Sequence, residues 1–233
     1  MKKKLYFCEI GDIYDNQVRV PYSTGLLWSY CKKFSEITNN YELKDWIFWR
    51  EDLEIMLDKF EKPDIVGFSH FVWNEQVNND LAKLIKEKYP NCIIIYGGQS
   101  APKQDRCKNF FKNHPFVDVL VHGEGEETFK QFLIEYVNGD FSKVKGLSYK
   151  VDNNKCHTNP PMDRIKDLGY MPSPYLDGTF DKLVKKSPYK IESIIETVRG
   201  CPYSCTFCEW GDSYFSKMKK QPLEKIYAEI DWA

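Results

Sequence analysis

The sequence predicts an α/β protein in which helices cover a largely parallel β-sheet, followed by the start of a second α/β unit. Two observations support this prediction. The first two thirds of the chain alternate short β-rich runs with segments of helical periodicity, as parallel sheets require. A proline-rich stretch then divides the chain, and a strand, a cysteine-rich loop and a helix follow it. The 233 residues give room for one complete domain and part of another.

The first domain is expected at residues 1–150. Runs rich in β-branched and aromatic residues predict its strands, and apolar residues three or four positions apart predict helices between them. Pro63 marks the end of one helix, and Asn138-Gly139 suits the C-terminus of another. The predicted strands are 4–10, 41–49, 64–69, 92–96 and 117–121, and the predicted helices lie around 23–34, 53–60, 77–85, 103–113 and 129–137.

The rest of the chain is expected to form two further parts. Residues 151–188 are assigned to a small hairpin and a proline-rich linker, with the hairpin strands around 146–151 and 156–159. Residues 189–233 are assigned to the first βα unit of a second domain. In that unit a strand is expected at 191–198, because its apolar residues alternate, and a helix is expected to begin at Gln221-Pro222.

Composition narrows the class of partner. Lysine and arginine number 33 against 34 acidic residues, so no net charge attracts nucleic acid or an anionic bilayer. The apolar run at the N-terminus breaks at Glu9 and Gly11, too early for a signal peptide, and no stretch approaches the ~20 apolar residues of a membrane-spanning helix. We therefore expect a cytoplasmic protein, with no nucleic-acid or membrane partner, whose function depends on local chemistry.

Three cysteines stand close together, Cys201, Cys205 and Cys208, with the spacing C-x3-C-x2-C. Thiolates are the usual ligands of iron-sulfur clusters, and three of them on a four-iron cluster leave one iron open to a small molecule. A structural zinc site is the alternative, but it needs a fourth ligand, and the nearest candidates, Cys156 and His157, lie beyond the linker. A two-cluster ferredoxin would need further cysteines at regular spacing. The loop is therefore assigned to a metal cluster.

A second site is expected where the strands of the first domain end. In an open α/β sheet, ligands bind beyond the carboxyl ends of the strands. Glycines in the loops there allow close backbone approach, and acidic residues at the start of the last helix suit its positive end. Tight turns in any such domain also need glycine, so a structural role stays open. The candidate cofactor-binding residues are Ser69, Trp73, Asn74, Gly97, Gly98, Gln99, Gly123, Glu124, Gly125 and Glu126.

The cysteine loop closely resembles that of the radical S-adenosylmethionine (SAM) enzymes. The family favours an aromatic residue before the third cysteine, here Phe207, and Arg199-Gly200-Cys201-Pro202 resembles the start of the loop in cobalamin-using members. The resemblance extends over nearly the whole chain. Segments that resemble the cobalamin-binding domain and linker of that family lie at 21–26, 63–69, 96–98, 117–118, 123–126 and 173–178.

This resemblance implies a fold, cofactors and an activity. The fold would be a flavodoxin-like or Rossmann-like cobalamin-binding domain, followed by the start of a radical SAM partial TIM-type barrel. Cys201, Cys205 and Cys208 would hold a 4Fe-4S cluster, and S-adenosylmethionine would bind at the open iron beside Phe207. A 5'-deoxyadenosyl radical would then form, and methylcobalamin would supply a methyl group, which is the chemistry of a methyltransferase acting at an unactivated centre.

The mode of cobalamin binding is expected to lack a histidine ligand. Domains that bind cobalt through histidine carry Asp-x-His-x-x-Gly after the first strand, whereas this chain has Asp-Ile-Tyr-Asp at 12–15. We therefore expect base-off cobalamin with no histidine on its lower face. His70 and His122 are not assigned as ligands, because a lone histidine in such a loop more often satisfies a hydrogen bond. Trp73 can pack beneath the cofactor or in the core, or can equally take part in the chemistry.

The chain is expected to be a fragment or one half of a split enzyme, because a complete barrel needs further βα units. The expected partners are a small-molecule or peptide substrate, a reducing protein such as flavodoxin or ferredoxin, and a chain that completes the barrel. The alternative function is a cobalamin-binding carrier or sensor that does not turn over. Production of 5'-deoxyadenosine would distinguish the enzyme from the carrier.

Overall fold

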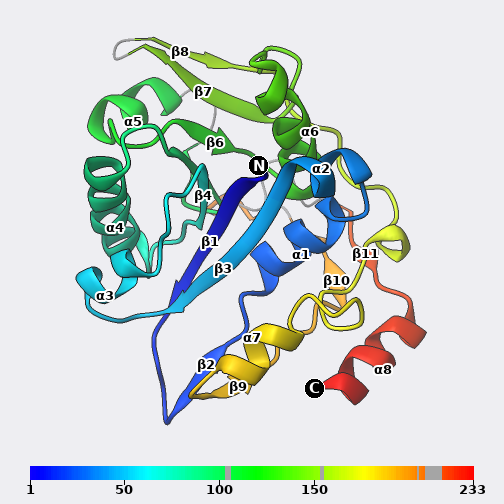
Figure 1. The fold of residues 1–233 in the computed structure, drawn as a ribbon. Helices are drawn as coiled ribbons and strands as arrows, with labels where there is room; N and C mark the ends of the chain where they lie inside the picture. The colour runs from blue at the N-terminus through cyan, green and yellow to red at the C-terminus, as the bar shows by residue number, and fades with distance from the viewer. Residues whose placement is uncertain (103–105, 153–154, 204, 208–216) are drawn as a thin grey trace.

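The computed structural model describes residues 1–102, 106–152, 155–203, 205–207 and 217–233, and within them a seven-stranded sheet has the order β3-β1-β4-β5-β6-β7-β8 (Figure 1). The first five strands in this order are parallel, and β7 and β8 extend the sheet as an antiparallel hairpin. The strands are β1 (Lys3–Gly11), β3 (Tyr41–Trp49), β4 (Ile65–Ser69), β5 (Ile93–Gly97), β6 (Val119–Val121), β7 (Leu147–Asp152) and β8 (Lys155–Thr158).

The order of the parallel strands is that of the flavodoxin-like fold. Numbered along the chain, the five parallel strands run 2-1-3-4-5, and the direction of progression reverses at β1. A crevice forms at such a reversal, beyond the carboxyl ends of the strands. The sequence-based prediction of a parallel α/β sheet is therefore confirmed, as is each of its five strands and the appended hairpin.

Helices cover both faces of the sheet. Alternate residues of β1 show why, because Leu5 and Phe7 face one helical layer while Tyr6 and Cys8 face the other, and all four are buried. The first layer contains α1 (Tyr22–Cys31), α2 (Ser35–Asn40) and α6 (Gly125–Asn138), and the second contains α3 (Leu53–Asp58), α4 (Glu75–Lys88) and α5 (Cys107–Asn113). None of the described helices is long and apolar enough to cross a membrane.

The proline-rich segment packs against the first domain. It contains a short 3-10 helix, η2 (Leu168–Tyr170), and α7 (Asp181–Lys186). Its side chains form a third apolar cluster with α1 and with β2 (Gln17–Arg19), a short strand that pairs in parallel with β9 (Lys190–Glu192). The buried members from this segment are Leu168, Met171, Tyr175, Phe180 and Leu183. The segment expected as a linker is thus anchored to the sheet domain.

The single strand expected at 191–198 is wrong. The chain forms β9 and then β10 (Val198–Arg199), and residues 193–197 between them are in neither strand. The reason is that the Tyr175 hydroxyl takes the backbone bonds of Ile194, accepting from its N–H at 3.0 Å and donating to its carbonyl at 2.6 Å. The predicted C-terminal helix forms as α8 (Leu223–Trp232), preceded by β11 (Lys219–Lys220), which pairs with β10.

The contact between Gly25 and Phe180 tests how firmly the proline-rich segment is anchored. A Cβ at Gly25 would lie 2.2 Å from Cζ of the fully buried Phe180 ring. Glycine to alanine in a helix normally stabilises, but here overpacking should lower the free energy of unfolding by about 1–3 kcal/mol. Urea denaturation of Gly25→Ala measures this loss.

Gly11→Ala is the matched control for this substitution. The nearest atom to its added Cβ is 3.9 Å away, so no clash arises. Phe180→Leu in the Gly25→Ala background should restore part of the lost stability. An unchanged or higher urea midpoint for Gly25→Ala would contradict the packing of Phe180 on α1.

Candidate functional site

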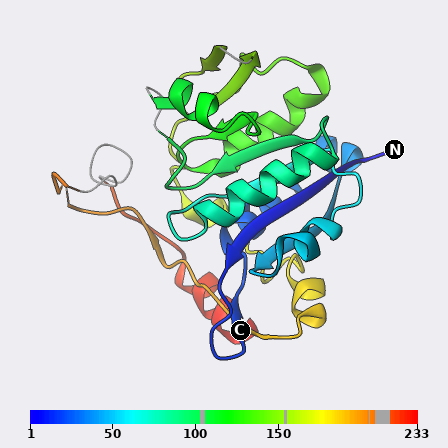
Figure 2. The ribbon, with the colours of Figure 1, turned by 90° about the vertical axis from the view of Figure 1, so that its left-hand side faces the viewer.

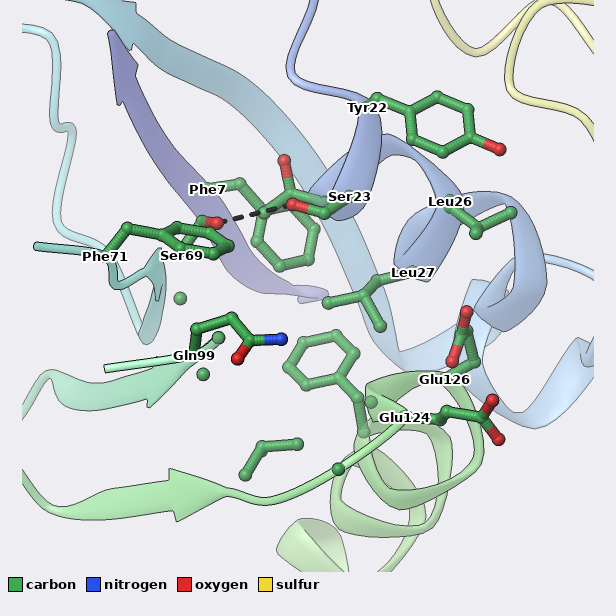
Figure 3. A pocket seen from close by; sticks show the side chains of 18 of the residues that line it. Phe7, Tyr22, Ser23, Leu26, Leu27, Ser69, Phe71, Gln99, Glu124 and Glu126 are labelled. Carbon is green, nitrogen blue, oxygen red and sulfur yellow. Dashed lines mark hydrogen bonds between the residues drawn. The ribbon is translucent and has the colours of Figure 1, made fainter. Parts of the chain in front are cut away.

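A cavity of about 350 Å³ opens at the carboxyl ends of the central strands, on the face covered by α1 and α6. Its walls come from the ends of β4, β5 and β6, from the first turns of α1 and from the start of α6 (Figure 3). Phe7, Leu27 and Phe129 make an apolar side. Of the predicted cofactor-binding residues, those that line the cavity are Ser69, Gly97, Gly98, Gln99, Gly123, Glu124, Gly125 and Glu126.

The glycine pair at the end of β5, Gly97 and Gly98, lines the cavity with backbone rather than side chains. Gly98 has φ +105°, and a Cβ there would lie 2.8 Å from the carbonyl oxygen of His70. The His70 N–H donates to the Gly97 carbonyl oxygen at 2.6 Å, and the Ser100 N–H donates to the His70 carbonyl oxygen at 3.1 Å. The loop after β4 and the loop after β5 are therefore locked together by backbone contacts that require glycine at position 98.

Polar groups line the cavity at the carboxyl end of β4 and on α1. The hydroxyls of Ser23 and Ser69 are 3.3 Å apart, and Gln99 extends into the same space from the end of β5 (Figure 3). Glu9 holds the start of α1, because its carboxylate accepts from the Thr24 N–H and Thr24 hydroxyl, each at 2.8 Å. Burial raises the pKa of Glu9, and these hydrogen bonds oppose the shift.

Glu9 was not among the residues predicted from the sequence to form the site. A carboxylate at the end of a strand, followed by Ser-Thr at the start of a helix, is the signal that could have identified it.

Trp73 and Asn74 lie outside the cavity lining. Asn74 is buried, and its amide donates to the carbonyls of Ile10 and Ser69 at 3.1 and 3.0 Å, which fixes the turn after β4. The Trp73 ring is 62% exposed and stacks on Phe71, with ring centroids 4.4 Å apart. Because Phe71 does line the cavity, Trp73 supports the wall from outside.

None of the four histidines lines the cavity. His70 packs on Tyr96 with ring centroids 4.5 Å apart, and His122 Nε2 lies 2.8 Å from the Ser148 hydroxyl. Burial lowers the pKa of each of these two side chains to about 4. Both are neutral at physiological pH, and both make their contacts inside the protein core.

Arg199 fixes the far side of the cavity. Its guanidinium makes two bonds to the Glu196 carboxylate, at 2.8 and 2.9 Å, and Nη1 lies 2.9 Å from Oε1 of Glu126 on α6. All three residues line the cavity. Burial raises the pKa of Glu126, while Arg199 acts in the opposite direction. The Oε2 atom of Glu126 is buried and has no hydrogen-bond partner among the residues that the structure describes.

The cysteine loop starts directly from this wall. Val198, Arg199 and Gly200 line the cavity, and Cys201 is the next residue. Gly200 has φ +121°, and a Cβ there would lie 2.6 Å from the Lys217 carbonyl oxygen, so the two sides of the loop approach each other where only glycine fits.

The cysteines of this loop follow Gly200 in the sequence. The segment that contains Cys201 and Cys205 projects from the body of the molecule (Figure 2). Both are free thiols, Cys201 half-buried and Cys205 exposed, and the Phe207 ring is 90% exposed. Cys208, the third predicted ligand, lies outside the described residues.

Comparison with known proteins gives consistent relatives, although no protein-family model matches the sequence. Over 99% of its length the chain is 35% identical to "Cobalamin-dependent radical SAM methyltransferase TokK" from Streptomyces tokunonensis. Over the same share it is 33% identical to "2-(S-pantetheinyl)-carbapenam-3-carboxylate methyltransferase" from Streptantibioticus cattleyicolor. The chain spans 34% of the length of each of these relatives.

Solved structures show the same fold at lower identity. The cobalamin-dependent S-adenosylmethionine radical enzyme OxsB, solved with aqua-cobalamin and S-adenosylmethionine bound, matches 99% of this chain with a TM-score of 0.68 and 20% identity, over 31% of its own length. The radical S-adenosylmethionine methyltransferase TsrM from Kitasatospora setae, solved with cobalamin and an iron-sulfur cluster, matches 99% with a TM-score of 0.65 and 15% identity, over 45% of its length.

The low pKa of the buried histidines predicts an acid-sensitive fold. Below pH 6.5 the unfolded chain binds protons at His70 and His122 that the folded chain takes up only near pH 4. Stability should therefore fall as pH drops from about 6.5 to about 4, by up to about 3 kcal/mol for each histidine. Urea denaturation across this range measures the loss.

His70→Phe keeps an aromatic ring against Tyr96 and removes one titrating group, so its stability should fall less steeply with acid. His157→Gln, at an exposed position, is the control and should follow the wild type. If the unfolding free energy of His70→Phe depended on pH as steeply as that of the wild type, the pKa of His70 would not be lowered in the folded chain.

Proposed function

The chain belongs to the family of cobalamin-dependent radical S-adenosylmethionine enzymes, and on this premise we propose that it takes part in methyl transfer to an unactivated centre. One observation carries the proposal. Residues 198–200 form a wall of the cavity, and the cysteine loop begins at the next residue. A molecule in the cavity and a cluster on the loop would therefore be neighbours, as a reaction that uses both requires.

The cavity is the proposed cobalamin site. Its position at the strand-order reversal favours a large cofactor, and its glycine wall admits a planar group. The Oε2 atom of Glu126, which has no hydrogen-bond partner within the described part of the chain, and the Gln99 amide suit a ligand rich in amide groups. Phe7, Leu27 and Phe129 would exclude water from the apolar side. Trp73 and Asn74 are proposed to act through the turn that they support.

The lower face of the cobalamin is proposed to lack a histidine ligand. The four histidines all lie outside the cavity lining, and His70 and His122 pack in the interior. A base-off cofactor without protein ligation is consistent with this arrangement.

The cysteine loop is the proposed cluster site. Cys201, Cys205 and Cys208 would hold a 4Fe-4S cluster, with Phe207 beside bound S-adenosylmethionine. When bound, these groups would supply an electron, a radical and a methyl group. The chain's own part is to fix the root of the loop through Gly200 and the Arg199 contacts.

Residues 1–150, 151–188 and 189–233 are proposed as the cobalamin domain, the hairpin and linker, and the first unit of the radical domain. A small-molecule substrate is proposed, because one relative is named for a carbapenam carboxylate. A flavodoxin or ferredoxin is proposed as reductant, and further sequence or a partner chain would complete the barrel.

Anaerobic reconstitution with iron and sulfide tests the cluster. Wild-type protein should bind about four iron atoms and become brown, whereas Cys201→Ala, Cys205→Ala or Cys208→Ala should each lose most of the iron. Cys156→Ala, a free thiol on β8, is the control and should keep it. Iron binding that survives loss of each loop cysteine would overturn the assignment.

Gly200→Ala should damage the loop without damaging the fold. Its Cβ would collide with the Lys217 carbonyl, so the loop should shift and iron uptake should fall by about half or more. Gly139→Ala is the matched control, because Gly139 also has positive φ, +74°, but no atom lies within 4 Å of the added Cβ. The proposal predicts full iron uptake for Gly139→Ala, and equal loss in both variants would contradict it.

A further inference from the structure

Glu124 joins four segments of the chain at one carboxylate. It occupies the N-cap position of α6, and its side chain is only 6% exposed. Oε2 accepts the Ile165 N–H at 2.6 Å. Oε1 lies 3.4 Å from Arg164 Nη2, 3.8 Å from Arg199 Nη1 and 4.0 Å from Lys219 Nζ. The carboxylate thus ties α6 to the proline-rich segment, to β10 and to β11.

Arg199 and Lys219 are directly paired across the β10–β11 ladder. One stands two residues before Cys201, and the other follows the cysteine loop on its return. Glu124 therefore contacts both sides of the base of the loop. A shift of one side relative to the other would lengthen at least one of these contacts.

The charges around Glu124 balance within the buried cluster. Glu124, Glu126 and Glu196 supply three negative charges, and Arg164, Arg199 and Lys219 supply three positive charges, with each side chain at most 20% exposed. Removing one partner from such a cluster leaves an uncompensated charge in a poorly solvated place. The arrangement therefore has one favoured geometry.

The same cluster forms part of the cavity. Glu124, Glu126, Glu196, Arg199 and Gly200 all line it. A ligand in the cavity would restrict the position of β10, and a metal on the cysteines would restrict the same strand from the other side. Each event orders residues that the other event also needs ordered.

We propose that Glu124 is a positioning residue that couples the two cofactor sites, so that cobalamin in the cavity and a cluster on the cysteine loop each strengthen the binding of the other. The inference rests on the proposed function. Its physical basis is that both carboxylate oxygens of Glu124 contact protein groups. The position of the loop base and the position of α6 therefore depend on each other. Coupling of this kind is reciprocal, so either affinity reports it.

The test is the cobalamin dissociation constant of the full chain, measured anaerobically with and without the reconstituted cluster. In wild-type protein the cluster should tighten cobalamin binding about fivefold or more. In Glu124→Gln this ratio should fall towards about one, and because Glu124 also lines the cavity, the ratio, not the cluster-free affinity, is the readout. The signature is a change in the ratio, which a merely destabilising substitution would not produce.

Glu127→Gln is the matched control. Glu127 is the third residue of α6, and its carboxylate accepts from Tyr30 and Gln131 and pairs with Lys130, outside the cavity lining. Its variant should keep the wild-type ratio. Lys219→Gln removes the contact between Lys219 and Glu124 and should also lower the ratio. It gives a second measurement if Glu124→Gln folds poorly.

Two outcomes would overturn the inference. A wild-type ratio of about one would show that the sites are independent, and an equal loss of affinity in both states of Glu124→Gln would show that Glu124 contacts the cofactor directly. Failure of wild-type protein to bind cobalamin or iron at all would instead contradict the proposed function and, with it, the coupling.

Discussion

The pairing of β1 with a parallel neighbour on each side is the constraint on which the site depends. β3 and β4 both hydrogen-bond to β1, so the chain must progress outward in opposite directions from this strand. The helices α1 and α4, which come after β1 and β4 in the chain, lie on opposite faces of the sheet, and the cavity opens at the carboxyl edge, where the first turns of α1 and the start of α6 line it. Residues 5–8 of β1 are buried and face both helical layers, so substitutions there would disturb the packing beside that space. The cavity is thus a product of topology before it is a product of particular side chains.

A buried charge network closes this space on the side away from the sheet. Arg199, Glu196 and Glu126 bring the start of the cysteine loop against α6, and Glu124 extends the contact to the proline-rich segment. Burying charges carries a desolvation cost, and only close pairing offsets it. Such a network contributes little net stability, but a shift of one partner would leave a buried charge unpaired. We therefore infer that the network holds the start of the cysteine loop in one position against α6.

Sequence reasoning identified the sheet well because its signals are local. Buried runs such as 92–96 and glycines that end strands predict both the elements and the edge of the sheet at which the cavity opens. The packing of 160–188 was missed because proline hides helical periodicity, and its apolar residues make sense only against α1 and β2. Glu124 was predicted as a cofactor-binding residue and lies in the cavity lining, but its partners Arg164 and Lys219 are 40 and 95 positions away, and no sequence pattern links them.

The insertion of Phe180 beneath Gly25 bears on how this protein can be recombined with its relatives. The ring occupies the space that a side chain on α1 would fill, so the first helix and the proline-rich segment are complementary surfaces. A chimaera that exchanges the sheet domain alone would separate these surfaces and leave an apolar hole on one and a protruding ring on the other. The exchangeable module therefore extends beyond α7, because β9 pairs with β2 and the backbone of Ile194 bonds to Tyr175, so the seam for such a graft lies after Ile194.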